Sequence, residues 1–433
     1  MTSDHRTLEF FFFDAGGGHR NAALALREVI AERYPGWTIS LINLQEILGP
    51  VDMFQKVTGL QSQDFYNAIL KRGWTFGSLA MLRTLQRGIR HYSPSFEDVL
   101  EKHWRGSKPD IVVSLIPNFN LILFQALRRV HADIPYVTVM TDLADFPPHF
   151  WLEKQDQFMI CGTDRAAVQA EDTGYRPERI FQSSGMILKP IFYRDIADDR
   201  RAAREAVGLD PDLPTALIMF GGYGSKTAEK IVKRLTRAQL PLQTIVMCGH
   251  NEKLRGALKD RPGCHAVGFT DRVPDYMRMA DFFIGKPGPG SISEALHMGL
   301  PVVIERNNLT MPQERYNTEW VQEHRAGIVL DSFRGVREGV AALTGRIDEY
   351  RAAVTRIKNR AIFEIPEILD SLLRLSGAGS DTHRFHPAFP VRPAPASDLG
   401  SIRAAAERSA TVPPPRSVAG SAARRRARRH RRA

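Results

Sequence analysis

The chain has 433 residues, 43% of them hydrophobic and 25% charged, which is enough to build two or three soluble domains with apolar cores. No stretch approaches the roughly 20 consecutive apolar residues of a membrane-spanning helix, so the composition excludes a helical integral membrane protein. The net charge of +11 is unevenly placed, because residues 376–433 hold 12 Arg, no Lys and 3 acidic residues. The remainder of the chain is therefore nearly neutral.

The N-terminal residues and the cysteines together predict a cytoplasmic protein. The segment before residue 10 has no basic region followed by a long apolar one, and four phenylalanines at 10–13 are too few for a signal peptide. They are better interpreted as a buried strand. Cys161, Cys248 and Cys264 show no CxxC spacing, which is typical of reduced, buried thiols.

The segment 376–433 is rich in Pro, Ala and Ser and ends in an arginine run at 424–432. Such a composition cannot bury enough apolar surface to order itself, so we expect a disordered tail. Three roles stay open for it. It could contact anionic lipid headgroups, at about 1 kcal/mol per basic residue, bind nucleic acid nonspecifically, or have no dedicated partner.

The rest of the chain alternates strand-like and helix-like runs. The strand-like runs cover 8–13, 38–44, 111–115, 136–141, 157–160 and 180–182, and then 215–220, 243–247, 265–268, 282–285, 301–304 and 327–330. Helix-like runs lie between them, for instance at 22–34, 166–173, 227–237 and 291–298. This alternation is typical of parallel sheets with crossover helices. We predict an α/β fold with two Rossmann-like domains facing each other across a cleft.

The predicted organisation has five parts. The N-terminal Rossmann-like domain spans 1–190, a Pro-containing linker spans 191–213, the C-terminal Rossmann-like domain spans 214–350, a C-terminal helix spans 351–375, and the tail spans 376–433. Ligands of open α/β sheets bind at the carboxyl ends of the strands, so we expect the active site in the cleft.

One insert at 49–93 interrupts the alternation. Its aromatic and aliphatic residues, Trp74 and Phe76 among them, are interleaved with cations such as Lys71 and Arg72. This mixture favours an element that lies in a membrane interface. An ordinary helical subdomain packed on the core would explain it equally well.

A first glycine-rich turn follows the first strand and contains Gly16, Gly17, Gly18 and His19. Glycines let backbone amides approach a ligand, and a helix N-terminus favours negative charge. A histidine at this position has suitable chemistry to take a proton from a hydroxyl near neutral pH. The alternative is a histidine that only caps the helix.

A second turn, with Gly222, Gly224 and Ser225, follows the first strand of the second series, and it could bind a ligand through its amides or be purely structural.

The third turn carries the most information. Gly285 to Pro301 places a Gly/Pro turn between a strand and a helix, with Gly288 at its centre. The backbone amides of Gly290, Ser291 and Ile292 would point at a diphosphate. Glu294 could accept both hydroxyls of a ribose, or it could be the glutamate of a capping box that begins at Ser291. Lys286 either adds charge near the phosphates or is only solvated.

A polar pair, Gln313 and Glu314, begins a later helix after Met311-Pro312. Adjacent donors and acceptors at a helix start can read sugar hydroxyls, although such a pair is usually a solvated helix face.

Taken together and in this order, these motifs resemble the monogalactosyldiacylglycerol synthase branch of glycosyltransferase family 28, which includes bacterial diacylglycerol glucosyltransferases. The resemblance covers about residues 8–345, and its firmest parts are 14–20, 138–143, 247–251, 268–269 and the run GKPGPGSISEAL at 285–296. It implies a GT-B architecture in which the first domain, 1–190, binds the acceptor and the second domain, 214–350, binds a UDP-sugar donor.

The resemblance also implies roles for single residues. Glu294 would grip the ribose, Phe269 would lie at the uracil, and Gln313 and Glu314 would contact the donor hexose. His19 would be the catalytic base, and the 49–93 insert would engage lipid.

The implied reaction is a single displacement that inverts the anomeric carbon. His19 removes the proton from a diacylglycerol hydroxyl, and the leaving UDP is stabilised at Gly288–Ile292 with help from the 222–225 turn. Asp142 would orient His19 or the acceptor, unless it is only a turn carboxylate. No DxD motif follows a strand at the expected cleft, so we expect no obligatory metal and no cofactor besides the donor, UDP-galactose or UDP-glucose.

The expected partners are the UDP-sugar, diacylglycerol and an anionic membrane surface, with the protein cytoplasmic and peripheral on the inner face of the cell membrane. Nucleic acid is an unfavoured partner. Two other functions stay open. One is a UDP-sugar transferase with a polyprenyl-linked or soluble acceptor. The other is a non-catalytic protein that binds lipid or nucleic acid through its tail.

Overall fold

The computed structural model describes residues 5–14, 18–48, 78–91, 93–147, 149–194 and 199–377. Gly16, Gly17, most of the 49–93 insert and the tail beyond residue 377 lie outside these ranges. The expectations placed on them therefore stay predictions.

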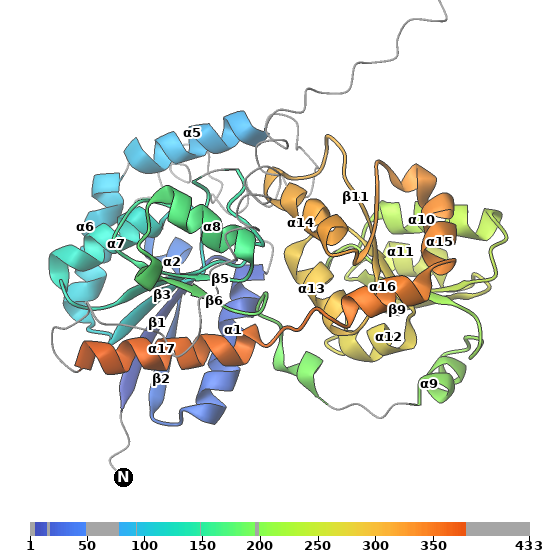
Figure 1. Ribbon diagram of the computed structural model, residues 1–433, viewed down its shortest axis with the longest axis horizontal. Coiled ribbons are helices and arrows are strands. Elements are labelled where there is room, and N and C mark those ends of the chain that lie inside the picture. The colour runs from blue at the N-terminus through green and yellow to red at the C-terminus, as the bar shows by residue number, and fades with distance from the viewer. Residues whose placement is uncertain are drawn as a thin grey trace, which may run out of the picture. The chain divides into compact units, whose positions relative to one another are not determined.

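The first of two sheets has six parallel strands in the order β2-β1-β3-β4-β5-β6 (Figure 1). These are β1 (Arg6–Phe12), β2 (Trp37–Asn43), β3 (Ile111–Ser114), β4 (Tyr136–Val139), β5 (Phe158–Cys161) and β6 (Ile180–Gln182). The helices of this part are α1 (Gly18–Arg33), α2 (Leu44–Leu48), α5 (Ser78–His91), α6 (Ser93–Gly106), α7 (Asn120–Val130) and α8 (Asp164–Thr173). The strand order reverses between β1 and β3, which is where open α/β sheets bind ligands.

The phenylalanine run of β1 explains why this strand lies inside the sheet. Successive side chains of a strand point to opposite faces. Phe10 packs with Leu26 of α1 on one face, while Phe11 packs with Trp104 of α6 on the other. A central strand that is buried on both faces therefore requires consecutive apolar residues.

The second sheet has the order β12-β11-β10-β7-β8-β9, again with parallel strands. Its strands are β7 (Thr215–Met219), β8 (Gln243–Gly249), β9 (Cys264–Gly268), β10 (Phe282–Gly285), β11 (Val302–Glu305) and β12 (Gly327–Leu330). Its helices are α9 (Arg200–Ala206), α10 (Lys226–Arg237), α11 (Glu252–Leu258), α12 (Val273–Met279), α13 (Pro289–His297), α14 (Pro312–Glu323) and α15 (Val336–Thr344). All twelve predicted strands are present, and the switch point of this sheet lies between β7 and β10.

The end of the described chain returns to the first sheet. The sequence predicted one helix at 351–375, but the structure has α16 (Ile347–Val354) and then α17 (Ala361–Gly377). Helix α17 lies beside α1 (Figure 1). Its buried side chains, such as Ile365 and Leu369, join the same hydrophobic cluster as α1 and β1. The C-terminal helix therefore stabilises the first domain, although the second domain precedes it in sequence.

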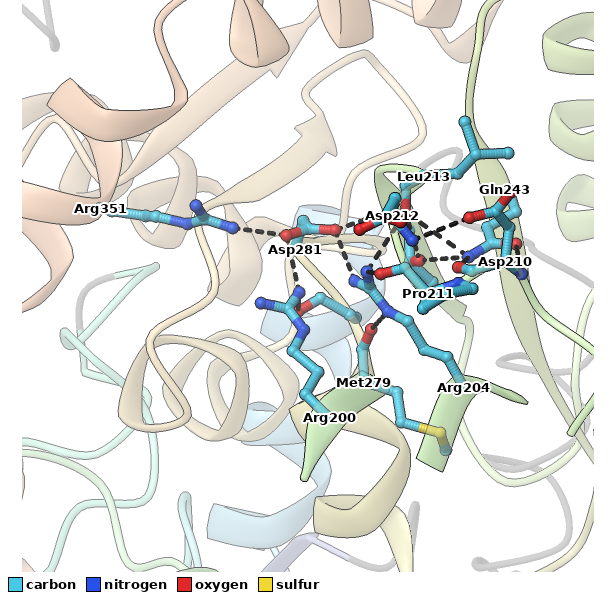
Figure 2. Close-up of polar contacts among 12 residues, drawn as sticks. Arg200, Arg204, Asp210, Pro211, Asp212, Leu213, Gln243, Met279, Asp281 and Arg351 are labelled. Atoms are coloured by element: carbon cyan, nitrogen blue, oxygen red, sulfur yellow. Dashed lines mark hydrogen bonds and ion pairs between the residues drawn. The ribbon is translucent and has the colours of Figure 1, made fainter. Parts of the chain in front are cut away.

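A charged network joins the linker and α16 to the second sheet (Figure 2). The carboxylate of Asp281 accepts hydrogen bonds from Arg200, Arg204 and Arg351 at 2.6–2.7 Å, and from the backbone amide of Thr215 at 2.8 Å. Burial raises the pKa of Asp281, but the Thr215 amide and the arginines outweigh burial and lower the pKa below its ordinary value. The carboxylate of Asp281 thus holds α9 and α16 at the amino ends of β7 and β10.

Candidate active site

His19 lies at the switch point of the first sheet. It is the second residue of α1, which follows β1 directly, and its Nδ1 lies 3.0 Å from the hydroxyl of Thr141, just after β4. The backbone of Leu115, which follows β3, also hydrogen bonds to the imidazole. Residues that follow β3 and β4 therefore hold the imidazole of His19, which itself follows β1, because these three strands are neighbours in the sheet.

The environment of His19 keeps the imidazole neutral. Burial lowers its pKa to about 4, although the hydrogen bond to Leu115 acts in the opposite direction. A neutral imidazole has one N–H and one lone pair. The bond to Leu115 raises the pKa because the carbonyl of Leu115 accepts an imidazole N–H. If that hydrogen is on Nδ1, beside the Thr141 hydroxyl, the lone pair of Nε2 is available to take a proton.

Asp142 is 8% exposed, and its nearest hydrogen-bond partner is Trp151 rather than His19. The indole Nε1 of Trp151 donates to Oδ2 of Asp142 at 2.8 Å, and the same indole lies 5.8 Å from the imidazole of His19, centroid to centroid. Burial raises the pKa of Asp142 to about 7, with Glu314 and Asp145 adding to the rise and Trp151 opposing it. Asp142 and His19 thus contact the same indole, and no described hydrogen bond joins them directly.

The loop that carries Trp151 is held by a second buried carboxylate, that of Asp145. Its two oxygens accept the backbone N–H groups of His149 and Trp151 at 2.8 and 2.6 Å. Gln169 of α8 binds the backbone of Asp145 on both sides, at 2.9 and 3.0 Å. The sequence analysis gave no role to Trp151 or Asp145, because no local sequence pattern predicts the contacts that they make.

In the second domain, the turn of Gly222, Gly224 and Ser225 leads from β7 into α10. Gly224 has φ +59°, which favours glycine, and the hydroxyl of Ser225 caps α10 by accepting the N–H of Thr227 at 3.1 Å. The carbonyl of Gly222 accepts the N–H of His250 at 2.9 Å. The turn is therefore tied to the carboxyl end of β8.

Phe269 is 58% exposed and follows β9. Its ring stacks on His250 with centroids 4.0 Å apart and planes 16° apart, while Tyr223, 71% exposed, lies 5.9 Å from His250. Three exposed rings at neighbouring strand ends form a surface on which a planar base can stack.

The start of α13 decides between the two interpretations of Glu294. The helix begins at Pro289, with Gly288 as its N-cap and no side-chain cap. Ser291 is therefore the third helical residue and not the N-cap, so Ser291 and Glu294 do not form a capping box.

The amides at this helix start are fewer than the sequence suggested. The N–H of Ile292 donates to the carbonyl of Gly288 at 3.1 Å, so the expectation that it faces a diphosphate is wrong. The amides of Gly290 and Ser291 precede the first intrahelical bond, and Pro289 has no N–H to offer. Two amides and the helix dipole remain for an anion.

Glu294 lies in the second turn of α13, and its carboxyl group makes no hydrogen bond or ion pair within the described residues. Burial raises its pKa to about 7, and Lys189 partly opposes the rise. A half-buried carboxyl group without a partner is suited to accept hydroxyl groups from a ligand.

The polar pair at the start of α14 splits. Glu314 is buried, and its carboxylate binds the ammonium of Lys286 at 3.0 Å, whereas Gln313 makes only a weak contact to the sulfur of Met311. Asn317, one turn later, donates to the carbonyl of Pro287 at 2.8 Å. Helix α14 is therefore bound to the Gly/Pro turn at two consecutive residues of that turn.

The loop after β4 contacts α14. Leu143 and Ala144 share a buried cluster with Tyr316, and the charges of Glu314 and Lys286 both act on Asp142. The structure thus brings Asp142 close to the residues expected at the donor hexose. No described hydrogen bond joins His19 to any residue of the second domain.

Metal sites and membrane spans are both absent from the part of the chain that the structure describes. No group of three His, Cys, Asp or Glu side chains there is arranged to hold a metal ion. No helix there combines the length and the apolar character that crossing a bilayer demands.

Comparisons with known proteins agree with this geometry. The glycosyltransferase family 28 C-terminal domain matches residues 216–343. The chain is 26% identical over 392 residues to the chloroplastic monogalactosyldiacylglycerol synthase of Spinacia oleracea, covering 83% of this chain and 71% of that protein. It is 31% identical over 305 residues to the probable monogalactosyldiacylglycerol synthase 3 of Oryza sativa subsp. japonica, covering 66% and 58%.

Solved structures share the fold. MurG of Acinetobacter baumannii has a TM-score of 0.51 at 14% identity, covering 84% of this chain and 99% of that one. The spinosyn rhamnosyltransferase SpnG, complexed with thymidine diphosphate, has a TM-score of 0.54 at 13% identity, covering 85% and 99%. This chain is therefore a glycosyltransferase that carries the family 28 C-terminal domain and is similar, over most of its length, to the monogalactosyldiacylglycerol synthase branch of that family.

Proposed function

We propose that the protein transfers galactose or glucose from a UDP-sugar to the hydroxyl of diacylglycerol, with inversion at the anomeric carbon. The observation that carries the proposal is the environment of His19. A neutral imidazole is held at the switch point of one sheet, and a helix N-terminus with two available amides lies at the switch point of the other.

The chemistry begins with the acceptor hydroxyl. Nε2 of His19 takes its proton as the oxygen attacks C1 of the sugar, provided that the neutral imidazole carries its hydrogen on Nδ1. The negative charge of an ionised Asp142, which shares the neighbour Trp151 with His19, favours the imidazolium that forms. Because the pKa of Asp142 is raised to about 7, this carboxylate ionises in the range in which the base must work.

The donor side supplies an anion site and a ribose site. The N–H groups of Gly290 and Ser291 donate hydrogen bonds to the diphosphate, and the carboxyl group of Glu294 accepts hydrogen bonds from the ribose hydroxyls. Phe269 offers its exposed face to the uracil, and Gln313 and Glu314 face the hexose. The synthases from spinach and rice, named for a galactolipid product, support a lipid acceptor.

A transfer assay tests the proposal. Radiolabelled UDP-galactose and UDP-glucose are each incubated with diacylglycerol vesicles, polyprenyl phosphate vesicles or a soluble extract, and the products are separated. We expect a labelled diacylglycerol glycoside that His19→Ala abolishes, while UDP binding by calorimetry stays within about twofold and the exposed control His5→Ala keeps full activity. Label found only in polyprenyl or soluble products would show that diacylglycerol is not the acceptor. Transfer at the wild-type rate by His19→Ala would show that His19 is not the base.

The membrane contact is a separate part of the proposal, in which the protein is cytoplasmic and peripheral. Helix α5 places Arg83, Arg87 and Arg90 on exposed positions, spaced by four and three residues so that they share one face. We expect the triple Ala variant to sediment less with anionic vesicles than wild type, and both to bind neutral vesicles equally. Equal sedimentation of both with anionic vesicles would place the membrane contact elsewhere.

Deleting residues 378–433 measures the contribution of the tail to vesicle binding. If the full chain shows no sugar transfer and binds nucleic acid in a salt-sensitive way that this deletion abolishes, the non-catalytic alternative is favoured.

A further inference from the structure

Lys286 occupies a position that its pairing with Glu314 does not fully explain. It follows the last residue of β10 and begins the turn that leads into α13. Its ammonium lies 3.0 Å from Oε1 of Glu314, yet 44% of its side chain is exposed. An ammonium group has three N–H donors. The one described bond leaves two N–H donors for a further acceptor.

The neighbouring glycine locates the ammonium of Lys286. A Cβ atom placed on Gly288 would lie 3.3 Å from Cε and 3.6 Å from Nζ of Lys286. The ammonium therefore lies beside the N-cap residue of α13, next to the available amides of Gly290 and Ser291. A positive side chain and the positive end of a helix dipole meet at one place.

The position of Lys286 is set by α14. The carboxylate of Glu314 is buried and holds the ammonium, while Asn317 holds the carbonyl of Pro287 at 2.8 Å. The ion pair with Glu314 thereby favours one location of the lysine ammonium before any ligand arrives. Preorganised charges of this kind are effective because they need no rearrangement during the reaction.

We propose that Lys286 is a catalytic residue whose ammonium contacts the leaving diphosphate. The inference rests on the proposed function. The bond from C1 of the hexose to the diphosphate oxygen breaks and its electron pair stays on that oxygen. A bond forms from the acceptor oxygen to C1, and the acceptor proton passes to His19. Lys286, still bound to Glu314, donates a hydrogen bond to the diphosphate and stabilises the charge that develops there.

Two nucleotides and one double variant test this role. Lys286→Met removes the charge and keeps most of the apolar stem, and Lys230→Met, on the exposed side of α10, is the matched control. UDP and UMP affinities are measured by calorimetry, since UMP lacks the second phosphate. Glu314→Gln is combined with Lys286→Met to remove the charge that Lys286 pairs with. If Lys286 only neutralises Glu314, its loss should have no further effect on activity in the Glu314→Gln background.

We expect Lys286→Met to weaken UDP binding about tenfold and UMP binding less than twofold, and to lower kcat roughly 100-fold, the usual loss when one charge-stabilising donor is removed. Lys286→Arg should recover part of kcat. The loss of kcat should persist in the Glu314→Gln background.

Equal losses for UDP and UMP, or a double variant as active as Glu314→Gln alone, would overturn the role of Lys286. A wild-type protein that neither binds UDP nor transfers a hexose would overturn the proposed function itself, so the two failures are distinguishable.

Discussion

Gly249→Ala tests the geometry of the donor turn without assuming any activity. Gly249 ends β8 with φ +57°, and a Cβ atom there would lie 2.0 Å from the carbonyl oxygen and 2.6 Å from the carbonyl carbon of Gly222. The obstructing atoms are backbone, so a rotamer change cannot relieve the clash. The turn at Gly222 must move, and the hydrogen bond from His250 to Gly222 is lost with it.

The expected cost follows from two contributions. A non-glycine residue in the left-handed region costs roughly 1–2 kcal/mol, and the lost backbone hydrogen bond costs about 1 kcal/mol. The sum of about 2–3 kcal/mol lowers Tm by roughly 5–10 °C for a domain of this size. Because the turn is part of the proposed donor site, UDP affinity should fall as well.

The assay is thermal unfolding by circular dichroism, with UDP calorimetry on the same preparations. Gly256→Ala is the matched control, because Gly256 lies inside α11 and a Cβ atom added there would meet no atom within 4 Å. Alanine favours a helix interior by about 1 kcal/mol, so this control should keep or raise Tm. A Gly249→Ala protein that melts with wild type would refute the close approach of β8 to the turn.

Three further predictions concern buried carboxyl groups. Asp281→Asn leaves three arginines without their shared anion and should lower the free energy of unfolding by roughly 2–3 kcal/mol in a denaturant titration. The loss is smaller than for a fully buried pair because two of the arginines are partly exposed. The control Asp348→Asn, at a side chain that is 95% exposed, should leave the free energy of unfolding unchanged. Folding raises the pKa of Asp142 to about 7, so its contribution to stability is complete below pH 4 and is lost as the pH rises to 7; Tm of Asp142→Asn relative to wild type should therefore increase from pH 5 to pH 8, and a constant difference would contradict the raised pKa. Glu294→Gln should weaken UDP binding about tenfold without lowering Tm, whereas a lower Tm with unchanged UDP affinity would restore a structural role.

The strands and glycine turns were predictable because their signals are local. The phenylalanine run of β1 is apolar on both faces, and each glycine turn lies between a strand and a helix. The start of α13 also had a local signal that spacing alone obscured. Pro289 is favoured at the first helical position, which makes Gly288 the N-cap and removes the capping box. The same register assigns the Ile292 amide to the helix.

The pairings that complete the site could not be predicted from the sequence. Asp142 and Trp151 are nine residues apart and meet because Asp145 folds the loop between them. Lys286 and Glu314 are separated by β11 and meet only when the second sheet is formed. Each of these contacts joins the end of a strand to a later loop or helix start, and no periodic pattern in the sequence marks such a pair.

Charged side chains of the second domain act on the pKa of Asp142 in the first domain. Burial alone would keep Asp142 protonated near neutral pH, and the nearby carboxylate of Glu314 strengthens that tendency. The ammonium of Lys286 opposes both effects, since it lowers the pKa of Asp142 while it binds Glu314. If a bound diphosphate shares the ammonium while Lys286 stays paired with Glu314, part of this compensation is lost, and the pKa of Asp142 rises further. The charge bound on the donor side of the site therefore influences the protonation state of Asp142 on the acceptor side.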